Sequence, residues 1–204
     1  MLAYNSFRKT LDRVQRLIDA HGTLHGGGPG RPQQQAADVL RAAVVLTVAA
    51  LDAFVGDVTI EAIPELARKG RLGTQAHTIV KPQDLLAALA SADPALELQR
   101  FARSRFARTT LQSPASITNH LDNYLGYTVD WAQIAGRIGV PTPADAQAAL
   151  GAYVERRHGI AHAGDVAPGK KGASPINKPY VERGRDVVAA VAGVLNTDLD
   201  AHIL

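Results

Sequence analysis

Apolar side chains recur at helical spacing along most of the chain. Near the N-terminus, Phe7, Leu11, Val14 and Ile18 follow one another at spacings of four, three and four, the stripe of an amphipathic helix. The last helix that the pattern predicts, from Tyr180 to Asn196, carries a similar stripe of valines. No run alternates with period two between turn signals. The pattern therefore predicts an all-α fold.

The segment from Ala36 to Ile63 is predicted to be the longest helix, with a break or kink at Pro64. It is apolar nearly all round between Ala42 and Val55, so other helices must cover most of its surface. Its longest uncharged apolar run, Ala42 to Leu51, is well short of the ~20 residues that cross a bilayer. We expect a buried central helix and no contact with a membrane.

Prolines and capping residues predict where the shorter helices begin. Starts are expected at Pro82, at Pro94 after Asp93, and at Pro114 after Ser113. A further short helix is expected from Asp130 to Ile138, ended by Gly139.

Two segments lack helical periodicity and are predicted to be loops. Residues 21–35 are rich in Gly, Pro and Gln, and residues 163–178 are rich in Gly, Pro and Lys. With 204 residues the length favours one domain over residues 1–204. The expected architecture is an up-and-down helical bundle with one long central helix and additional short helices.

Composition narrows the class of protein. The chain contains no cysteine, which excludes a disulfide framework and a thiol nucleophile. The first 20 residues carry charges every few positions and lack the apolar run of a signal peptide, so we expect a cytoplasmic protein. A formal net charge of +3 is compatible with a polyanionic partner.

The densest group of chemically useful side chains lies between Tyr153 and Gly164. Arg156, Arg157, His158 and His162 fall within seven consecutive residues. Arginine suits a phosphate, and histidine moves protons near neutral pH. This stretch is the candidate site.

A helix is expected to run from Pro143 and to end near His158, because Gly159 carries the signal of a C-terminal cap with basic residues in the turn before it. On one continuous helix, Arg157 and His162 would point about 140° apart. A break at Gly159 removes that obstacle, and His162 is then expected to fold back toward Arg157.

The spacing from Arg157 to His162 resembles the Arg-x4–6-His motif of the HEPN superfamily, with His158 at the polar position that follows the arginine. The apolar segment from Val44 to Ile63, with Asp52 embedded in it, resembles the long helix of HEPN proteins of the RiboL-PSP-HEPN type. Together these segments cover about a third of the chain.

The resemblance implies an endoribonuclease that needs neither a metal nor another cofactor. RNA carries its own nucleophile, the 2′-hydroxyl, so cleavage to a 2′,3′-cyclic phosphate and a 5′-hydroxyl requires only a proton acceptor, a proton donor and a cation. His162 is the expected acid or base and Arg157 the phosphate-binding cation. His158 is a second proton carrier or a hydrogen-bonding support, and Asp52 is expected to position one of these side chains.

The same resemblance implies a homodimer in which two copies of the motif share one cleft. A role as a toxin or phage-defence effector, held in check by an antitoxin or another partner protein, is compatible with it. The rival interpretation is a non-catalytic HEPN-like module that binds RNA, a nucleotide or a protein.

Basic side chains outside the catalytic group are candidates for binding RNA. They gather on one expected helix, beside the motif and in the loop that follows it: Arg100, Arg103, Arg105, Arg108, Arg156, Lys170 and Lys171.

Two structural readings of the stretch compete with catalysis. Arg156, Arg157 and His158 could be cations that merely favour a helix C-terminus. Alternatively, His158 and His162, four residues apart and near Asp165, form a metal site on one helix face, although a break at Gly159 weighs against it. Asp52 likewise has a structural reading, as a capping or ion-paired residue where helices cross.

Overall fold

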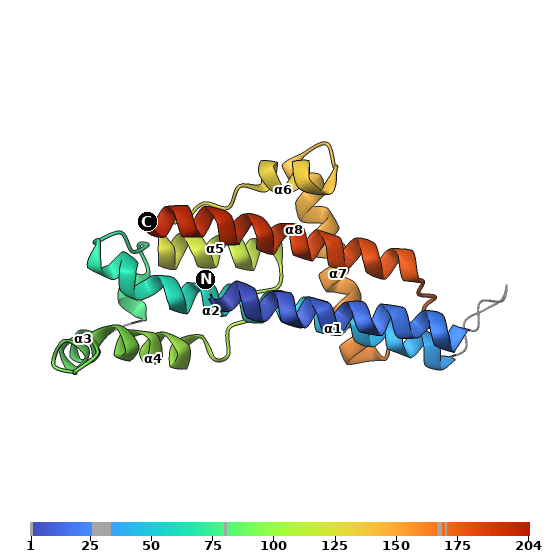
Figure 1. Cartoon of the computed structure of the whole chain (residues 1–204), viewed down its shortest axis with the longest axis horizontal. Helices are drawn as coiled ribbons and strands as arrows, with labels where there is room; N and C mark the ends of the chain where they lie inside the picture. Colours follow the sequence, from blue (N-terminus) through green and yellow to red (C-terminus); the bar gives the residue numbers. More distant parts are fainter. Residues whose placement is uncertain (1, 26–33, 80, 167–168, 170) are drawn as a thin grey trace.

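The computed structural model of the chain is a bundle of helices, shown in Figure 1. It describes residues 2–25, 34–79, 81–166, 169 and 171–204, and no strand occurs among them. The predicted all-α class is therefore confirmed. The helices are α1 (Leu2–His25), α2 (Gln34–Arg68), α3 (Pro82–Leu89), α4 (Pro94–Phe106), α5 (Pro114–Leu125), α6 (Trp131–Ile138), α7 (Pro143–Ala163) and α8 (Lys178–Ile203), with a short 3-10 helix at Ala76–Thr78.

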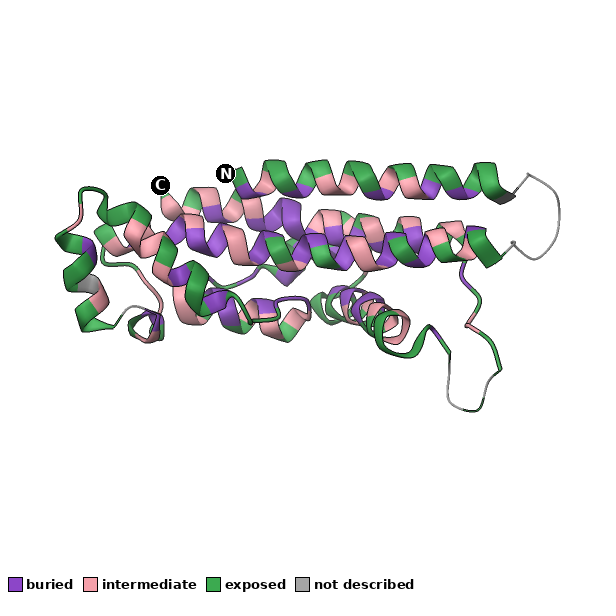
Figure 2. Cartoon of the chain, turned by 90° about the horizontal axis from the view of Figure 1, so that it is seen from below, coloured by how far each residue is buried: buried purple, intermediate pink, exposed green. Residues whose placement is uncertain are grey.

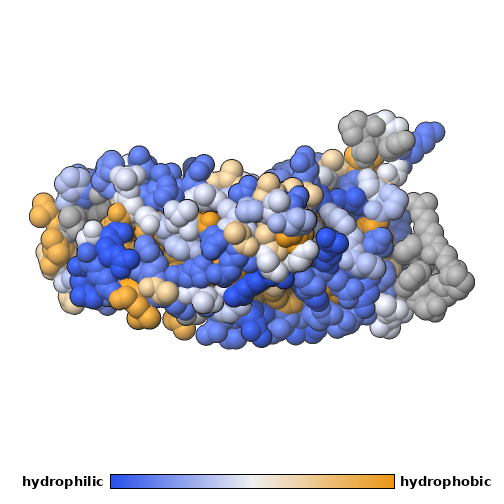
Figure 3. All heavy atoms as spheres, turned by 90° about the horizontal axis from the view of Figure 1, so that it is seen from above, coloured by the Kyte–Doolittle hydropathy of each residue, from blue (hydrophilic) through white to orange (hydrophobic). Residues whose placement is uncertain are grey.

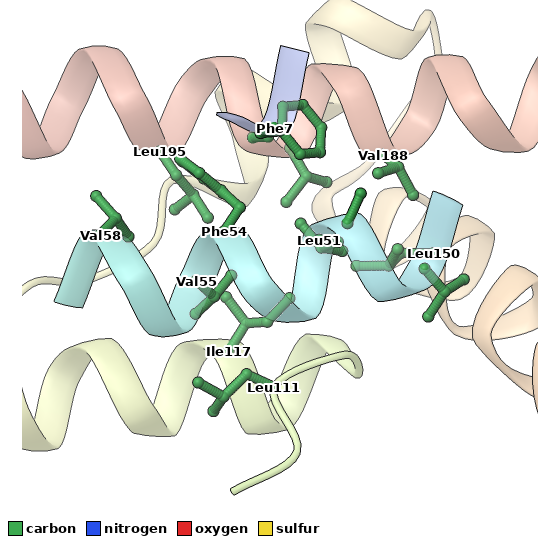
Figure 4. Packing of buried hydrophobic residues seen from close by; sticks show 14 of the residues in the cluster. Phe7, Leu51, Phe54, Val55, Val58, Leu111, Ile117, Leu150, Val188 and Leu195 are labelled. Atoms are coloured by element: carbon green, nitrogen blue, oxygen red, sulfur yellow. The ribbon is translucent and has the colours of Figure 1, made fainter. Parts of the chain in front are cut away.

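Helix α2 lies at the centre and packs against α1, α4, α5, α7 and α8. The buried faces of the helices turn toward it, as Figure 2 shows. Figure 4 shows Phe54 of α2 meeting Phe7 of α1 in this core, with ring centroids 5.3 Å apart. Leu51, Leu150 and Leu195, from α2, α7 and α8, are fully buried in the same cluster. The long helix is thus the central element that its all-round apolar pattern predicted.

Helix α2 is longer than expected, because Pro64 lies inside it and the helix continues to Arg68. A proline removes one backbone hydrogen bond and crowds the preceding turn. Ile63 and Leu66 are both buried in the core, and this packing on each side of the proline keeps the chain helical. Such tertiary packing commonly outweighs a local preference.

By length and composition alone, α2 also passes as a membrane span, since an 18-residue window in it has a mean hydropathy of 2.0. Half of that window is buried inside the bundle. A core helix of a soluble protein has the same character, and the packing of α2 against five other helices fits that description.

The proline-based helix starts are confirmed at Pro82, Pro94 and Pro114. Side chains of Asp93 and Ser113 accept hydrogen bonds from the first turns of their helices, as N-caps do. The predicted loops are shorter than expected. Residues 21–25 belong to α1 and residues 34–35 to α2, while residues 26–33 lie outside the described residues.

Among the described helices, α3 packs only against α4, so no other described helix covers its outer face. Leu86 and Leu89 of α3 and Leu96 of α4 are all exposed. Figure 3 shows apolar side chains gathered at the end of the molecule where α3 lies.

Helix α7 crosses behind α8 and α2 rather than running alongside them (Figure 1). The crossing with α8 is close because Gly184 has no side chain. A Cβ at that position would lie 1.9 Å from the Tyr153 ring, and Tyr153 is itself buried. This contact fixes the part of α7 that precedes the candidate site.

Candidate functional site at the C-terminal end of α7

Helix α7 does not end at His158. It continues through Gly159 to Ala163, and the left-handed cap is Gly164, with φ of 59°, whose N–H donates to the carbonyl of Gly159. The predicted helix end was therefore wrong. Glycine inside a helix costs only about 1 kcal/mol, and the next glycine, Gly164, offers the chain an equally good cap five residues later.

Because the helix is continuous, His158 and His162 lie one turn apart on the same face. Their ring centroids are 5.9 Å apart and the ring planes differ by 14°. Both side chains are exposed, and neither ring makes a hydrogen bond within the described part of the chain. We call these two residues the histidine pair.

Arg157 points away from His162 by about 140° on this continuous helix. It continues the buried stripe that Leu150, Tyr153 and Val154 form on α7. The side chain is half-buried, and its Nε atom is buried without a hydrogen-bond partner. Among the described residues, Arg157 makes no ion pair. The predicted fold-back of His162 toward Arg157 is thus absent within one chain.

The neighbouring arginine has a different environment. Arg156 Nη2 donates to Asp165 Oδ2 at 2.8 Å, and Arg41 Nε of α2 donates to the same oxygen at 2.8 Å. Asp165 is 5% exposed and Arg41 is 9% exposed. Two guanidinium groups thus neutralise one buried carboxylate, as burial of a charge requires. We call Arg41, Arg156 and Asp165 the arginine–aspartate cluster.

The cluster also holds the segment that follows α7. The Asp165 carbonyl accepts a hydrogen bond from Ser174 N at 2.7 Å, and the Ser174 carbonyl accepts from Arg41 at 2.9 Å and from Arg156 at 3.2 Å. Asp165 adopts a positive φ of 65°, which costs free energy for a residue with a side chain. These contacts offset that cost. They also hold together the N-terminal part of α2, the C-terminal end of α7 and the segment that follows α7.

Arg156 was predicted to bind RNA, but its contacts are structural. Besides Asp165 and Ser174, it donates to the carbonyl of Pro175 at 3.0 Å. Sequence reasoning missed Arg41, and it considered Asp165 only as a residue near a possible metal site and not as the partner of two arginines. The available signal was Arg41 itself, a cation at the edge of an apolar helix, which implies a carboxylate partner elsewhere in the fold.

Asp52 does not contact the site residues. Its carboxylate accepts hydrogen bonds from Leu111 N at 2.5 Å and from Gln112 Nε2 at 2.8 Å. It lies 11 residues beyond Arg41 on α2, about 16 Å along the helix axis. A structural role therefore accounts for this carboxylate: it holds the segment that precedes α5 against α2.

The four arginines of α4 and the turn after it differ in what they contact. Arg100 pairs with Glu97 at 2.9 Å and Arg103 pairs with Asp57 at 3.3 Å, both as exposed pairs of small energetic weight. Arg105 and Arg108 make no ion pair among the described residues, and with Lys81 and Phe101 they line a groove of about 560 Å³.

The two loop lysines are also distinguishable. Lys171 is exposed and lines a cavity of about 480 Å³ between the loop and the start of α2, beside Arg41. Lys170 lies outside the described residues. Within the described residues, no group of three or more His, Asp or Glu side chains is arranged to hold a metal ion.

Comparison with known proteins identifies the family. A family model described as RiboL-PSP-HEPN matches residues 8–197. No curated protein and no solved structure gave a significant match. HEPN-type domains have ribonuclease-like or nucleotide-related functions. The match spans nearly the whole chain and agrees with the all-α bundle and with the arginine–histidine motif on α7, so this chain belongs to the RiboL-PSP-HEPN family.

Proposed function

We propose that this protein is a metal-independent endoribonuclease. In the proposed reaction a base removes the proton from an RNA 2′-hydroxyl, the oxygen attacks the adjacent phosphorus, and an acid protonates the departing 5′-oxygen. The products are a 2′,3′-cyclic phosphate and a 5′-hydroxyl. General acid–base catalysis of this kind contributes about 10²–10⁴-fold to a rate.

The observation that carries the proposal is the contrast around residues 156–162. The histidine pair is exposed and side by side, and the adjacent Arg157 makes no ion pair within the described part of the chain, whereas Arg156 is committed to Asp165. An arginine without a carboxylate partner is available to a phosphate. His162 and His158 are proposed as proton carriers and Arg157 as the phosphate-binding cation.

We further propose that the working unit is a homodimer. Within one chain, Arg157 and His162 diverge by about 140°, whereas a second copy related by a twofold axis brings another His162 to the opposite side of a bound phosphate. Isologous dimers juxtapose the same patch of both subunits.

The alternative is an active monomer in which His158 supplies the second proton function. The short distance between the two rings favours it. Light scattering combined with activity measured across dilution separates the two arrangements. Activity that falls as the dimer dissociates supports the shared cleft, and a fully active monomer contradicts it.

RNA is proposed to bind along basic side chains that are not consumed by internal ion pairs, chiefly Arg105, Arg108 and Lys171. Neutralising phosphates releases counterions, so affinity should fall steeply with salt. The exposed pairs of Arg100 and Arg103 can exchange their carboxylates for phosphates at small cost. A cytoplasmic location, and regulation by an antitoxin or another partner protein, are proposed on the sequence and on family membership alone.

One observation favours the non-catalytic alternative. Arg157 follows the buried face of α7, so in a monomer it does not converge with His162. A protein that only binds RNA or a nucleotide has no need of that convergence. The cleavage assay below distinguishes the two functions.

The test is an RNA cleavage assay with EDTA present, comparing the wild-type protein with His162→Ala and His77→Ala. His77 is an exposed histidine outside the site, which makes it a matched control. We expect wild type and His77→Ala to release 2′,3′-cyclic phosphate ends, and His162→Ala to lose about 10²–10⁴-fold in rate while remaining folded. Unchanged cleavage by folded His162→Ala removes the catalytic assignment.

A further inference from the structure

The continuity of α7 changes the chemistry open to its two histidines. A break at Gly159 would have separated them, but His158 and His162 occupy positions i and i+4 of an uninterrupted helix. Two histidines at this spacing project from one helix face and can ligate the same metal ion. Imidazole is a preferred ligand of Zn²⁺ and of other late first-row dications.

The distance between the rings fits a shared ion. With zinc–nitrogen bonds of about 2.0–2.1 Å and tetrahedral geometry, two ligating imidazoles have centroids about 5 Å apart. The observed separation is 5.9 Å. Both side chains are exposed, so their rotamers adjust on the nanosecond timescale without disturbing the core.

The described residues around the histidine pair leave both rings free to bind a metal ion, and they supply no further protein ligand for that ion. Neither ring is hydrogen-bonded within the described residues, so no hydrogen bond must be broken when a metal binds. Asp165, the nearest acidic residue after the pair in sequence, gives one oxygen to Arg41 and Arg156 and is buried. With no third protein ligand in the described part of the chain, the remaining coordination positions belong to water or to a phosphate oxygen.

We infer that His158 and His162 form a binding site for a transition-metal dication such as Zn²⁺, and that occupation of this site switches off RNA cleavage. The inhibitory part rests on the proposed function: an imidazole nitrogen that ligates a metal cannot accept or donate a proton. The binding part stands on the geometry of the histidine pair alone. Hard cations such as Mg²⁺ prefer oxygen ligands and leave the pair free.

Binding is tested with the untagged full-length protein, because a polyhistidine tag would itself take up the metal. Zinc chloride is titrated calorimetrically into wild type, His158→Ala, His162→Ala and His77→Ala. We expect one site per chain in wild type and in His77→Ala, and an affinity at least about tenfold lower in each of the other two variants. Wild-type affinity in either His158→Ala or His162→Ala overturns the site.

Inhibition is tested in the same preparations by following RNA cleavage. Cleavage should fall over the zinc concentrations at which the calorimetric site fills, recover when EDTA is added, and remain unchanged with Mg²⁺. Full cleavage at saturating zinc overturns the inhibitory part. If the wild-type protein cleaves no RNA under any condition, the proposed function fails, while zinc binding that depends on both histidines still supports the site.

Discussion

Arg156 and Arg157 are neighbours in sequence, yet they belong to two different regions of the molecule. Arg156 belongs to the arginine–aspartate cluster, where it shares the carboxylate of Asp165 with Arg41. Arg157 lies one residue and about 100° further round the helix, without an ion pair among the described residues. A single residue step on a helix thus separates an arginine that is ion-paired within the fold from one that makes no ion pair among the described residues.

The two regions also differ in what their polar groups contact. In the arginine–aspartate cluster, Asp165 and Arg41 are buried and Arg156 is half-buried, and the opposite charges neutralise one another, as burial of a charge requires. The histidine pair is exposed and unengaged. Because these two side chains make no hydrogen bond among the described residues, replacing them should change the free energy of unfolding little.

The largest effect on stability is expected from Asp165. Replacing it with Gly keeps the positive φ accessible but removes the carboxylate that Arg41 and Arg156 share. Breaking a buried ion pair from one side costs about 3–5 kcal/mol, measured as a fall in the free energy of unfolding in urea.

Two further variants separate charge from backbone strain at the same position. Asp165→Ala should be less stable than Asp165→Gly, because alanine tolerates the positive φ poorly. Asp165→Asn should be the mildest, since asparagine accepts the same backbone conformation and keeps an acceptor oxygen. Equal stability of Asp165→Gly and wild type would mean that the arginine–aspartate cluster does not stabilise the fold.

A buried histidine provides a second contrast with the exposed pair. His120 packs against Phe106 and Tyr124, and burial lowers its pKa from 6.5 to about 4. The unfolded chain therefore binds a proton more readily than the folded one, so stability is complete above pH 6.5 and is lost as the pH falls toward 4. The loss is on the order of 3 kcal/mol.

His120→Phe should remove this part of the pH dependence, because phenylalanine fits among the aromatic rings and does not titrate. The measurement is the free energy of unfolding at pH 7.5 and at pH 5 in both proteins. His162→Ala is the matched control and should retain the wild-type difference between the two pH values. The same pH difference in His120→Phe as in wild type would contradict the assignment.

The smallest effect is expected at Gly159, and it tests the continuity of α7 directly. A Cβ at Gly159 meets nothing within 4 Å, and its helical conformation suits alanine. Gly159→Ala should therefore stabilise the protein by about 0.4–1 kcal/mol. Gly164→Ala, at the left-handed cap, should destabilise it by about 1–2 kcal/mol. A reversed order in thermal melts would put the helix end at Gly159.

Local sequence signals predicted most of the fold, because capping residues and prolines act on the backbone of the residues next to them. At Asp93-Pro94 and Ser113-Pro114, the capping side chain and the proline at the first helical position favour a helix start locally. At Pro64 and Gly159 the local signals gave wrong predictions, a break or kink at the first and a helix end at the second. Packing of Ile63 and Leu66 and the later cap at Gly164 outweighed the local preference.

The candidate site was predictable only in part. The motif residues Arg157, His158 and His162 lie close together in the sequence, so the sequence alone could single them out as candidates. The link from Arg41 to Asp165 spans 124 positions, and no local pattern joins them. Asp52 was correctly singled out as a carboxylate that needs a partner, but sequence alone could not tell that the partners are Leu111 and Gln112.

The central claim is that Arg156 stabilises the fold and that Arg157 serves the proposed RNA cleavage. The most direct test compares Arg156→Gln with Arg157→Gln in two measurements, urea unfolding and RNA cleavage at a temperature where both variants are folded. Arg156→Gln should lose about 1.5–3 kcal/mol of stability, since it loses hydrogen bonds to a charged group, and should still cleave. Arg157→Gln should keep its stability and lose about 10²-fold or more in cleavage. The opposite result, with cleavage lost in Arg156→Gln and retained in Arg157→Gln, would contradict the account.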